Sequence, residues 1–253
     1  MKWRYVHASE VGTSHLATGR PCEDSCWSMV DATTAGINVL SVFVADGAGS
    51  APRGGAGADE TIQAAAAFVA SKLRTPEFAF NDETAVELVM SVRERLYALA
   101  EQEKRTPRDF ACTFVGVVSS VLGTLVMQVG DGGAVIDVGN GLEVAVVPMT
   151  GEYANMTHFV TDEDAVSVLA TKSYPAVAKR VAVFSDGLQR LALNMSDNTA
   201  HTPFFSPFFK VLADSNDDQD GALHAALSQF LSSDKVNERT DDDKSLALAV
   251  LVE

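Results

Sequence analysis

The chain has 253 residues, of which 47% are hydrophobic and 21% are charged, a balance typical of a folded soluble protein. Acidic residues number 34 against 19 basic ones, and the net charge of -15 argues against nucleic acid or an anionic membrane surface as partner. No apolar run approaches the roughly 20 residues of a membrane-spanning helix and no signal segment opens the chain, so we expect a cytoplasmic location. The odd number of cysteines, three, favours reduced thiols.

The first part of the chain is expected to form strands around a glycine-rich loop. Its hydrophobic runs predict strands at residues 3–11, 25–31 and 39–45, with a loop over 12–23. The third run is apolar and β-branched with a single serine, which predicts a strand buried on both faces. This strand stops at Asp46, and the loop after it contains Gly47, Gly49, Gly54 and Gly55. A carboxylate thus lies where the backbone can bend tightly and approach a ligand.

Two helices are expected after this loop. An alanine-rich segment predicts the first over residues 58–73, and the Thr75-Pro76 pair ends it. Asn81 or Asp82 can cap a second helix, which runs to about Lys104 with apolar residues at helical spacing.

The second half of the chain alternates short strands with turns. Four strands are predicted at residues 113–119, 124–129, 134–138 and 142–147. The Asn140-Gly141 pair indicates a two-residue hairpin turn, so this part is expected to be an antiparallel meander. Polar residues at 161–164 predict the start of a helix, and the phenylalanines between 204 and 209 are expected to pack in the core. The remaining expected elements are a strand at 181–184, a helix at 221–231 and a strand at 246–252.

This order of elements predicts the fold class. Strands, two long helices, more strands, then helices and a last strand indicate an α+β fold in which sheets pack together and helices cover them. The sequence shows no internal repeat and no low-complexity linker. We therefore expect a single domain over residues 1–253.

Carboxylates recur at the ends of the predicted strands. Asp46, Asp131 and Asp186 each follow an apolar strand and precede a glycine, and Asp242 lies just before the last strand. One Asp-Gly pair is ordinary turn chemistry, but four such carboxylates favour a shared site at one sheet edge. Clustered carboxylates raise one another's pKa unless a cation neutralises them. A ligand set made only of oxygen atoms selects a hard ion such as Mg²⁺ or Mn²⁺.

The glycine-rich loop also allows a competing interpretation as a phosphate cradle for a nucleotide. That site would need a third glycine, where Pro52 stands, or a lysine after Gly54 and Gly55. Neither requirement is met, so the carboxylate site is favoured.

Six short motifs follow one another along nearly the whole chain. They are GRPCED (19–24), VADGAG (44–49), Thr113 in a strand, VGDG (129–132), FSDGL (184–188) and DDKS (242–245). In order and spacing they resemble the metal-dependent serine/threonine protein phosphatases of the 2C (PPM) type. Segments 12–24 and 151–155 are most similar to a bacterial branch of that family, whose members have P-C-Q-D where this chain has P-C-E-D.

The resemblance implies a four-layer α-β-β-α sandwich, with two antiparallel sheets flanked by helices and a dinuclear metal centre at one sheet edge. It implies catalysis through Asp46, Asp186 and Asp242, which would hold two Mn²⁺ or Mg²⁺ ions. Such ions lower the pKa of a bridging water and clamp the phosphoryl oxygens during in-line attack.

The resemblance also assigns individual metal ligands. Asp46 would bridge both ions, and the carbonyl of Gly47 would help to bind one of them. Asp186 and Asp242 would hold the first ion, while the second would be bound, partly through water, by Glu23 or Asp24. Asp131, together with Asp186, matches the position of a third, weaker ion.

Two positions depart from the family pattern. Members often carry a histidine after the first Asp-Gly as the general acid, and this chain has Ala48. The phosphate-binding arginine usually lies four residues before the glutamate of Glu-Asp, whereas Arg20 lies three before Glu23, so Arg20 and Arg53 both remain candidates. The histidines match no metal-binding spacing and are expected to be structural or exposed; they are His7, His15, His158, His201 and His224.

Two functions therefore compete. The resemblance implies a metal-dependent phosphatase that acts on phosphoserine or phosphothreonine in a protein, such as a Ser/Thr kinase or its target. The alternative is a catalytically weak or silent protein of the same fold that binds a partner such as a kinase. Retention of the metal carboxylates separates the two and favours the enzyme.

Overall fold

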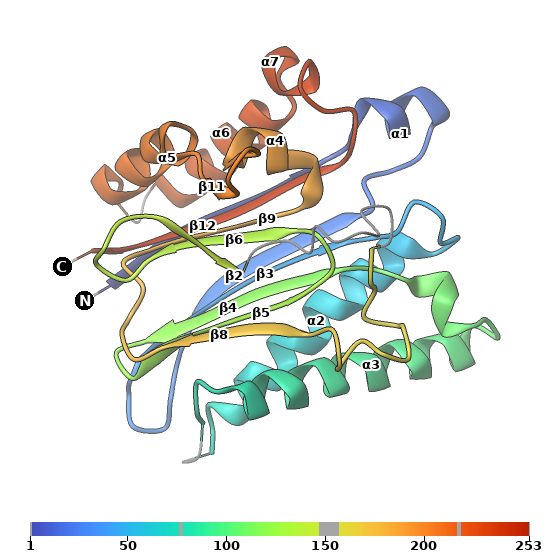
Figure 1. Cartoon of the computed structure of the whole chain (residues 1–253), viewed down its shortest axis with the longest axis horizontal. Coiled ribbons are helices and arrows are strands. Elements are labelled where there is room, and N and C mark those ends of the chain that lie inside the picture. Colours follow the sequence, from blue (N-terminus) through green and yellow to red (C-terminus); the bar gives the residue numbers. More distant parts are fainter. Residues whose placement is uncertain (1, 76–77, 147–156, 217–218, 253) are drawn as a thin grey trace.

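Two five-stranded antiparallel sheets form the middle of the molecule in a computed structural model, which describes residues 2–75, 78–146, 157–216 and 219–252. Helices cover the outer faces of both sheets, which gives four layers (Figure 1). The expected α-β-β-α sandwich is therefore confirmed. Segment 151–155, one basis of the family resemblance, lies outside the described residues.

The strand order differs from the sequence order in both sheets. The first sheet has the order β2-β3-β4-β5-β8, formed by β2 (Asp24–Ala32), β3 (Asn38–Asp46), β4 (Phe114–Ser120), β5 (Gly123–Val129) and β8 (Ala170–Tyr174). The second has the order β1-β12-β9-β6-β7, formed by β1 (Lys2–Glu10), β12 (Lys244–Val252), β9 (Arg180–Phe184), β6 (Gly133–Asp137) and β7 (Glu143–Val146). A separate small hairpin joins β10 (Leu193–Asn194) to β11 (Thr199–Ala200).

The helices divide between the two outer faces (Figure 1). The first sheet is covered by α2 (Gly54–Lys72) and α3 (Asp82–Gln102). The second is covered mainly by α5 (Thr202–Asp214) and α6 (Asp220–Leu231). The short helices are α1 (Thr13–Thr18), α4 (Gln189–Ala192), α7 (Asp234–Asn237) and the 3-10 turns η1 (Pro107–Phe110) and η2 (Asp186–Leu188). No described helix has both the length and the apolar character needed to cross a membrane.

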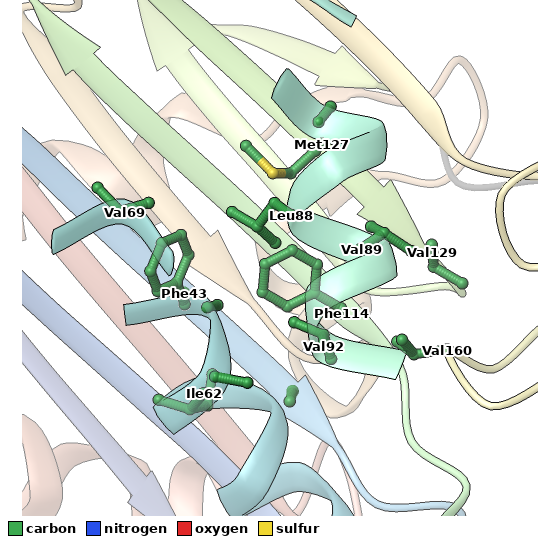
Figure 2. Close-up of a cluster of buried hydrophobic side chains, with 14 of the residues drawn as sticks. Phe43, Ile62, Val69, Leu88, Val89, Val92, Phe114, Met127, Val129 and Val160 are labelled. Carbon is green, nitrogen blue, oxygen red and sulfur yellow. The ribbon is translucent and has the colours of Figure 1, made fainter. Parts of the chain in front are cut away.

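Strand β3 is buried on both faces, as its sequence predicts. Its side chains alternate: Leu40, Val42 and Val44 pack between the sheets, while Val39, Phe43 and Ala45 pack with the α2 and α3 residues. Figure 2 shows the helix side of this core, with Phe43 and Phe114 of the sheet close to Leu88 and Val92 of α3. Because β3 is held from both sides, the position of Asp46 at its end is fixed.

Most expected elements are present. The three strands before residue 46, the helices α2, α3 and α6, and the last strand are confirmed with small shifts at their ends. Phe205 and Phe209 are buried, as expected for core residues, and they belong to α5. The sequence assigned no element to α5, in which Pro207 lies inside the helix, nor to β8.

The helix expected to begin at residues 161–164 is wrong, because these residues form turns. The Asp162 carboxylate accepts a hydrogen bond from the amide of Phe159, which precedes it, instead of capping the amides that follow. Arg93 donates to the carbonyls of Val160 and Asp162 and holds the segment against α3.

Two loops also differ from expectation. Residues 12–23, expected to be a loop throughout, contain α1. The hairpin at Asn140-Gly141 forms, but its loop spans residues 138–142 instead of two residues. Asp137 at the end of β6 accepts hydrogen bonds from the amides of Gly139 (2.6 Å) and Gly141 (3.0 Å), which stabilises the longer loop.

Candidate metal centre

Strand ends from both sheets meet at one end of the sandwich. In the first sheet β2 begins where β3 ends, and the two are paired so that Asp24 lies opposite Asp46. In the second sheet β12 begins where β9 ends, next to Asp186. Residues 130–132 link β5 of the first sheet to β6 of the second, so the chain crosses between sheets at this end. The topology therefore brings together carboxylates that are far apart in the sequence.

An open pocket of about 210 Å³ lies at this end. The predicted site residues that line it are Asp46, Gly47, Asp131, Asp186 and Asp242. Asp24 is buried, with 8% of its surface exposed, and interacts electrostatically with Asp46 and Asp186. The structure thus places six of the seven predicted metal ligands in one cluster.

Asp46 is fixed by the neighbouring strand as well as by its own. The hydroxyl of Thr113 accepts a hydrogen bond from the Asp46 amide (3.1 Å), and the Thr113 amide donates to the Asp46 carbonyl (2.8 Å). Thr113 also lines the pocket. Thr113, which is one of the six motif positions in the sequence, therefore holds the backbone of Asp46 in place.

Glycine is required beside two of the aspartates because the backbone approaches closely there. A Cβ atom on Gly47 would lie 2.4 Å from the carbonyl carbon of Gly54 and 2.7 Å from the carbonyl oxygen of Glu23. A Cβ atom on Gly187 would lie 2.1 Å from the carbonyl oxygen of Asp243. The Asp-Gly pairs therefore pack the strand ends tightly around the pocket instead of serving as exposed turns.

Four aspartates of the cluster, Asp24, Asp46, Asp186 and Asp242, have raised pKa values. Burial, followed by the charges of Asp243 and Asp186, raises the pKa of Asp24 to about 7. Burial and the charges of Asp131 and Asp242 raise the pKa of Asp186 to about 6.

The other two aspartates are affected in the same direction. Burial and the charges of Asp24 and Asp186 raise the pKa of Asp46 well above its usual range, and burial also raises the pKa of Asp242. Burial and repulsion of these carboxylates therefore destabilise the folded protein, and a positive charge in the pocket would relieve that destabilisation.

Unpartnered oxygen atoms show that the cluster fits a cation. Both carboxylate oxygens of Asp24 and the Oδ1 atom of Asp186 are buried and lack a hydrogen bond of normal geometry among the described residues, although the hydroxyls of Ser185 and Ser245 lie near Asp24. Buried polar atoms are normally paired, because an unpaired one costs about 1–3 kcal/mol. The carboxyl groups of Asp46 and Asp186 are also in hydrogen-bond contact with each other. Oxygen donors in this state suit a hard divalent ion.

Asp131 is held at the edge of the pocket by hydrogen bonds from Thr157 and Gln189. The Thr157 hydroxyl donates to its Oδ2 atom (2.6 Å), and the Gln189 side-chain amide donates to its carbonyl. Thr157 also lines the pocket. Neither partner was predicted from the sequence.

Glu23 and the two candidate arginines lie outside the pocket lining. The Glu23 carboxylate pairs with Arg20 (2.6 Å), whose guanidinium also donates to the carbonyl of Gly49 (3.3 Å) at the pocket rim. Arg53 pairs with Glu103 (2.8 Å) and lies over the ring of Phe110. Arg20 is therefore next to the pocket, whereas Arg53 is held by α3 and η1.

Two further residues of the site could not be identified from the sequence. Asp243 is 3% exposed and accepts hydrogen bonds from the amides of Gly12 and Glu23, each 2.6 Å long. His15, expected to be structural or exposed, lines the pocket. The only feature of the sequence that pointed to His15 as a site residue was its position in the same segment as Glu23 and Asp24.

A second and larger pocket, of about 520 Å³, adjoins the first. Both are lined by Ser50, Thr157 and Phe159, and the second also by Arg108. No ion pair of Arg108 is present among the described residues. The carboxylate pocket thus opens toward a wider space whose lining carries one arginine, Arg108, and two aspartates, Asp162 and Asp164.

The chain matches a family model and a characterised relative over most or all of its length. The family model described as protein phosphatase 2C matches residues 11–232. Serine/threonine-protein phosphatase 3 of Escherichia coli strain K12 is 53% identical over 253 residues, and the match covers 100% of both chains.

Solved structures share the fold at low sequence identity. The catalytic domain of the serine threonine protein phosphatase PstP, in complex with 2 manganese ions, has a TM-score of 0.63 at 15% identity and 99% coverage of both chains. The phosphatase Stp1 from Staphylococcus aureus has a TM-score of 0.60 at 12% identity, covering 99% of this chain and 96% of that one. With the match of the family model and the 53% identical relative, these results show that the chain belongs to the protein phosphatase 2C family.

Proposed function

We propose that residues 1–253 form one phosphatase domain, which hydrolyses phosphoserine and phosphothreonine in proteins and depends on divalent metal ions. The observation that carries the proposal is the cluster of buried aspartates with unpartnered oxygens at the meeting point of the two sheets. The 53% identical relative is named a serine/threonine-protein phosphatase, which supports the same reaction.

The cluster would hold two divalent ions. Asp46, Asp186 and Asp242 with the carbonyl of Gly47 would hold the first ion, and Asp46 would be shared with the second. Asp24 would support the second ion, with Glu23 acting through water. When bound, the ions supply Lewis acidity and a clamp for the phosphoryl oxygens.

Manganese is the first ion to test, with magnesium as the alternative. Both prefer oxygen donors, which are the only donors that the cluster offers. One structural neighbour is described in complex with 2 manganese ions. Asp131 beside Asp186 would provide a third and weaker ion site.

A protein substrate would approach across the second pocket. The phosphorylated side chain would enter the pocket of about 210 Å³, and residues beside it would occupy the adjoining space of about 520 Å³. Both arginines are paired with a glutamate, Arg20 with Glu23 (2.6 Å) and Arg53 with Glu103 (2.8 Å), but Arg20 is the better candidate for binding phosphate because it also contacts Gly49 at the pocket rim. A Ser/Thr kinase or its target is the proposed class of substrate protein.

Phosphate release from a phosphothreonine peptide tests this function directly. We expect turnover with added Mn²⁺ and none in excess chelator, and restored Mn²⁺ should recover it. Turnover that is undiminished by chelator would contradict a metal-dependent reaction. No turnover under any metal condition would instead favour a silent protein of the same fold that binds a partner.

A further inference from the structure

The proposed reaction needs a proton donor that the family pattern does not supply in this chain. When the bond between phosphorus and a serine or threonine oxygen breaks, the leaving alkoxide is strongly basic and must be protonated. The position after Asp46-Gly47, where many family members carry histidine, is Ala48, which is 8% exposed and lines the pocket. A proton donor must therefore come from another part of the pocket.

His15 is the one imidazole among the described residues that line this pocket. It lies in α1, which is anchored to the segment before β12 because the amide of Ser14 donates to the carbonyl of Asp241 (2.9 Å). The backbone at Gly12 also lies directly against this segment, since a Cβ atom there would be 2.3 Å from the carbonyl carbon of Asp242. These contacts hold the His15 side chain beside the aspartate cluster, with 12% of it exposed.

The ring of His15 is oriented by a buried carboxylate. Its Nδ1 atom lies 2.9 Å from Oδ2 of Asp243, which is 3% exposed and fixed by two backbone amides. Because a carboxylate only accepts hydrogen bonds, Nδ1 carries the proton in this contact. Nε2 is then the nitrogen left for the pocket. Histidine held by a buried aspartate in this way acts as an acid or base in several classes of hydrolase.

We propose that His15 is the general acid of the phosphatase reaction, with Asp243 as its positioning residue; the inference rests on the proposed function. The Nε2–H bond breaks as its proton passes to the serine or threonine oxygen, which keeps the electron pair of the broken P–O bond. Water forms the new P–O bond on the opposite side of phosphorus. The proton that this water loses restores the imidazolium, so one ester and one water yield one alcohol and one phosphate.

The decisive variant is His15→Asn. The asparagine amide can keep the hydrogen bond to Asp243, but it has no group at the position of Nε2. With Mn²⁺, we expect kcat on a phosphothreonine peptide to fall by about 10²- to 10⁴-fold, the usual contribution of a general acid. The fall on p-nitrophenyl phosphate should be less than about tenfold, because p-nitrophenolate is a weak base and leaves without a proton. Asp243→Asn should also lower the ratio of kcat on the phosphothreonine peptide to kcat on p-nitrophenyl phosphate. A loss of folded protein would lower both activities equally and leave this ratio unchanged.

Two further measurements separate catalysis from structure. His15→Asn should unfold cooperatively, as the wild type does, and should bind the same number of Mn²⁺ ions. His15→Gln is the second variant, used if His15→Asn does not fold. His201→Gln is the matched control, because His201 contacts the carbonyl of Leu191 (3.0 Å) at the start of α5 and does not line the pocket. It should change neither substrate's kcat.

The outcomes distinguish this inference from the proposed function. If the wild type hydrolyses both substrates and the His15 variants lose both in parallel, or lose neither, His15 is not the general acid. If the wild type with Mn²⁺ hydrolyses neither substrate, the proposed function fails and the inference fails with it. A selective loss on the phosphopeptide supports both.

Discussion

Two aspartates at opposite ends of the same strand pair, β6 and β9, have opposite environments. Asp137 ends β6 and lies opposite Arg180, whose guanidinium donates to its Oδ2 atom at 2.5 and 3.0 Å. Although burial raises the pKa of Asp137, the hydrogen bonds from Arg180, Gly139 and Gly141 hold it below its usual range. This carboxylate is fully paired within the chain.

Asp186 follows β9 at the other end and has no arginine partner among the described residues; its carboxyl group contacts only the Gly187 amide and the carboxyl group of Asp46. Its Oδ1 atom is buried without a hydrogen bond, and burial with the charges of Asp131 and Asp242 raises its pKa to about 6. A paired carboxylate of the Asp137 kind stabilises the fold. A buried carboxylate with a raised pKa, like that of Asp186, costs stability unless a cation binds it.

The largest effect is expected from removing the charge of a carboxylate in the aspartate cluster. Asp46→Asn or Asp186→Asn should lower phosphatase activity by about 10³-fold or more, because metal ions supply several kcal/mol of charge stabilisation and each 1.4 kcal/mol is tenfold in rate. In chelator, the same variants should melt at or above the wild-type temperature, since one repelling charge is gone. Phosphate release and thermal melting check these two expectations. Activity near the wild-type level in either variant would remove that residue from the metal centre.

The paired end should show the reverse behaviour. Asp137→Asn should lower the free energy of unfolding by about 1–3 kcal/mol, because Arg180 and two amides lose a charged acceptor. Activity per folded molecule should not change, because Asp137 is at the far end of the strand pair. Denaturant titration measures the first quantity and turnover at saturating Mn²⁺ the second. A stable but inactive variant would contradict the division between the two ends.

A smaller effect is expected from pH. In the metal-free protein, Asp24 and Asp186 have folded pKa values of about 7 and about 6, above the ordinary value of 3.8. The folded state therefore binds more protons than the unfolded state between about pH 4 and 7, so stability falls as pH rises through that window and then levels off. Each kcal/mol lost should lower the melting temperature by about 2–4 °C.

Melting scans in chelator between pH 5 and 8 measure this effect. Scans with saturating Mn²⁺ serve as the control and should lose the decline, because the ions displace the protons. A melting temperature in chelator that rises between pH 5 and 7 would show that the cluster does not carry the raised pKa values.

Much of the fold could be predicted because buried strands and helices have a clear hydrophobic pattern in the sequence. The apolar run of β3 and the spacing of α3 are examples. Elements fixed by distant contacts could not be predicted. The segment at 161–164 forms turns because Arg93 from α3 binds its carbonyls, and α5 continues through Pro207, which would ordinarily mark a break.

The same distinction applies to the site. Asp46, Asp131 and Asp186 could be found because each ends an apolar strand and precedes a glycine. His15 and Asp243 could not, because their roles depend on α1 lying against the segment before β12. Asp242 and Asp243 both line the pocket, and nothing in the sequence of three consecutive aspartates indicates that the carboxylate of Asp243 would bind backbone amides and His15.

Calorimetric titration of the metal-free protein with Mn²⁺ tests most directly whether the unpaired carboxylates form a metal centre. The proposed function predicts binding of two ions, with loss of binding in Asp46→Asn and unchanged binding in Asp137→Asn. Bound metal should also raise the melting temperature of the wild type, with about 2.7 kcal/mol of stabilisation at 100 times the Kd. An absence of binding heat and of any thermal shift in the wild type, or equal binding in Asp46→Asn, would contradict this assignment.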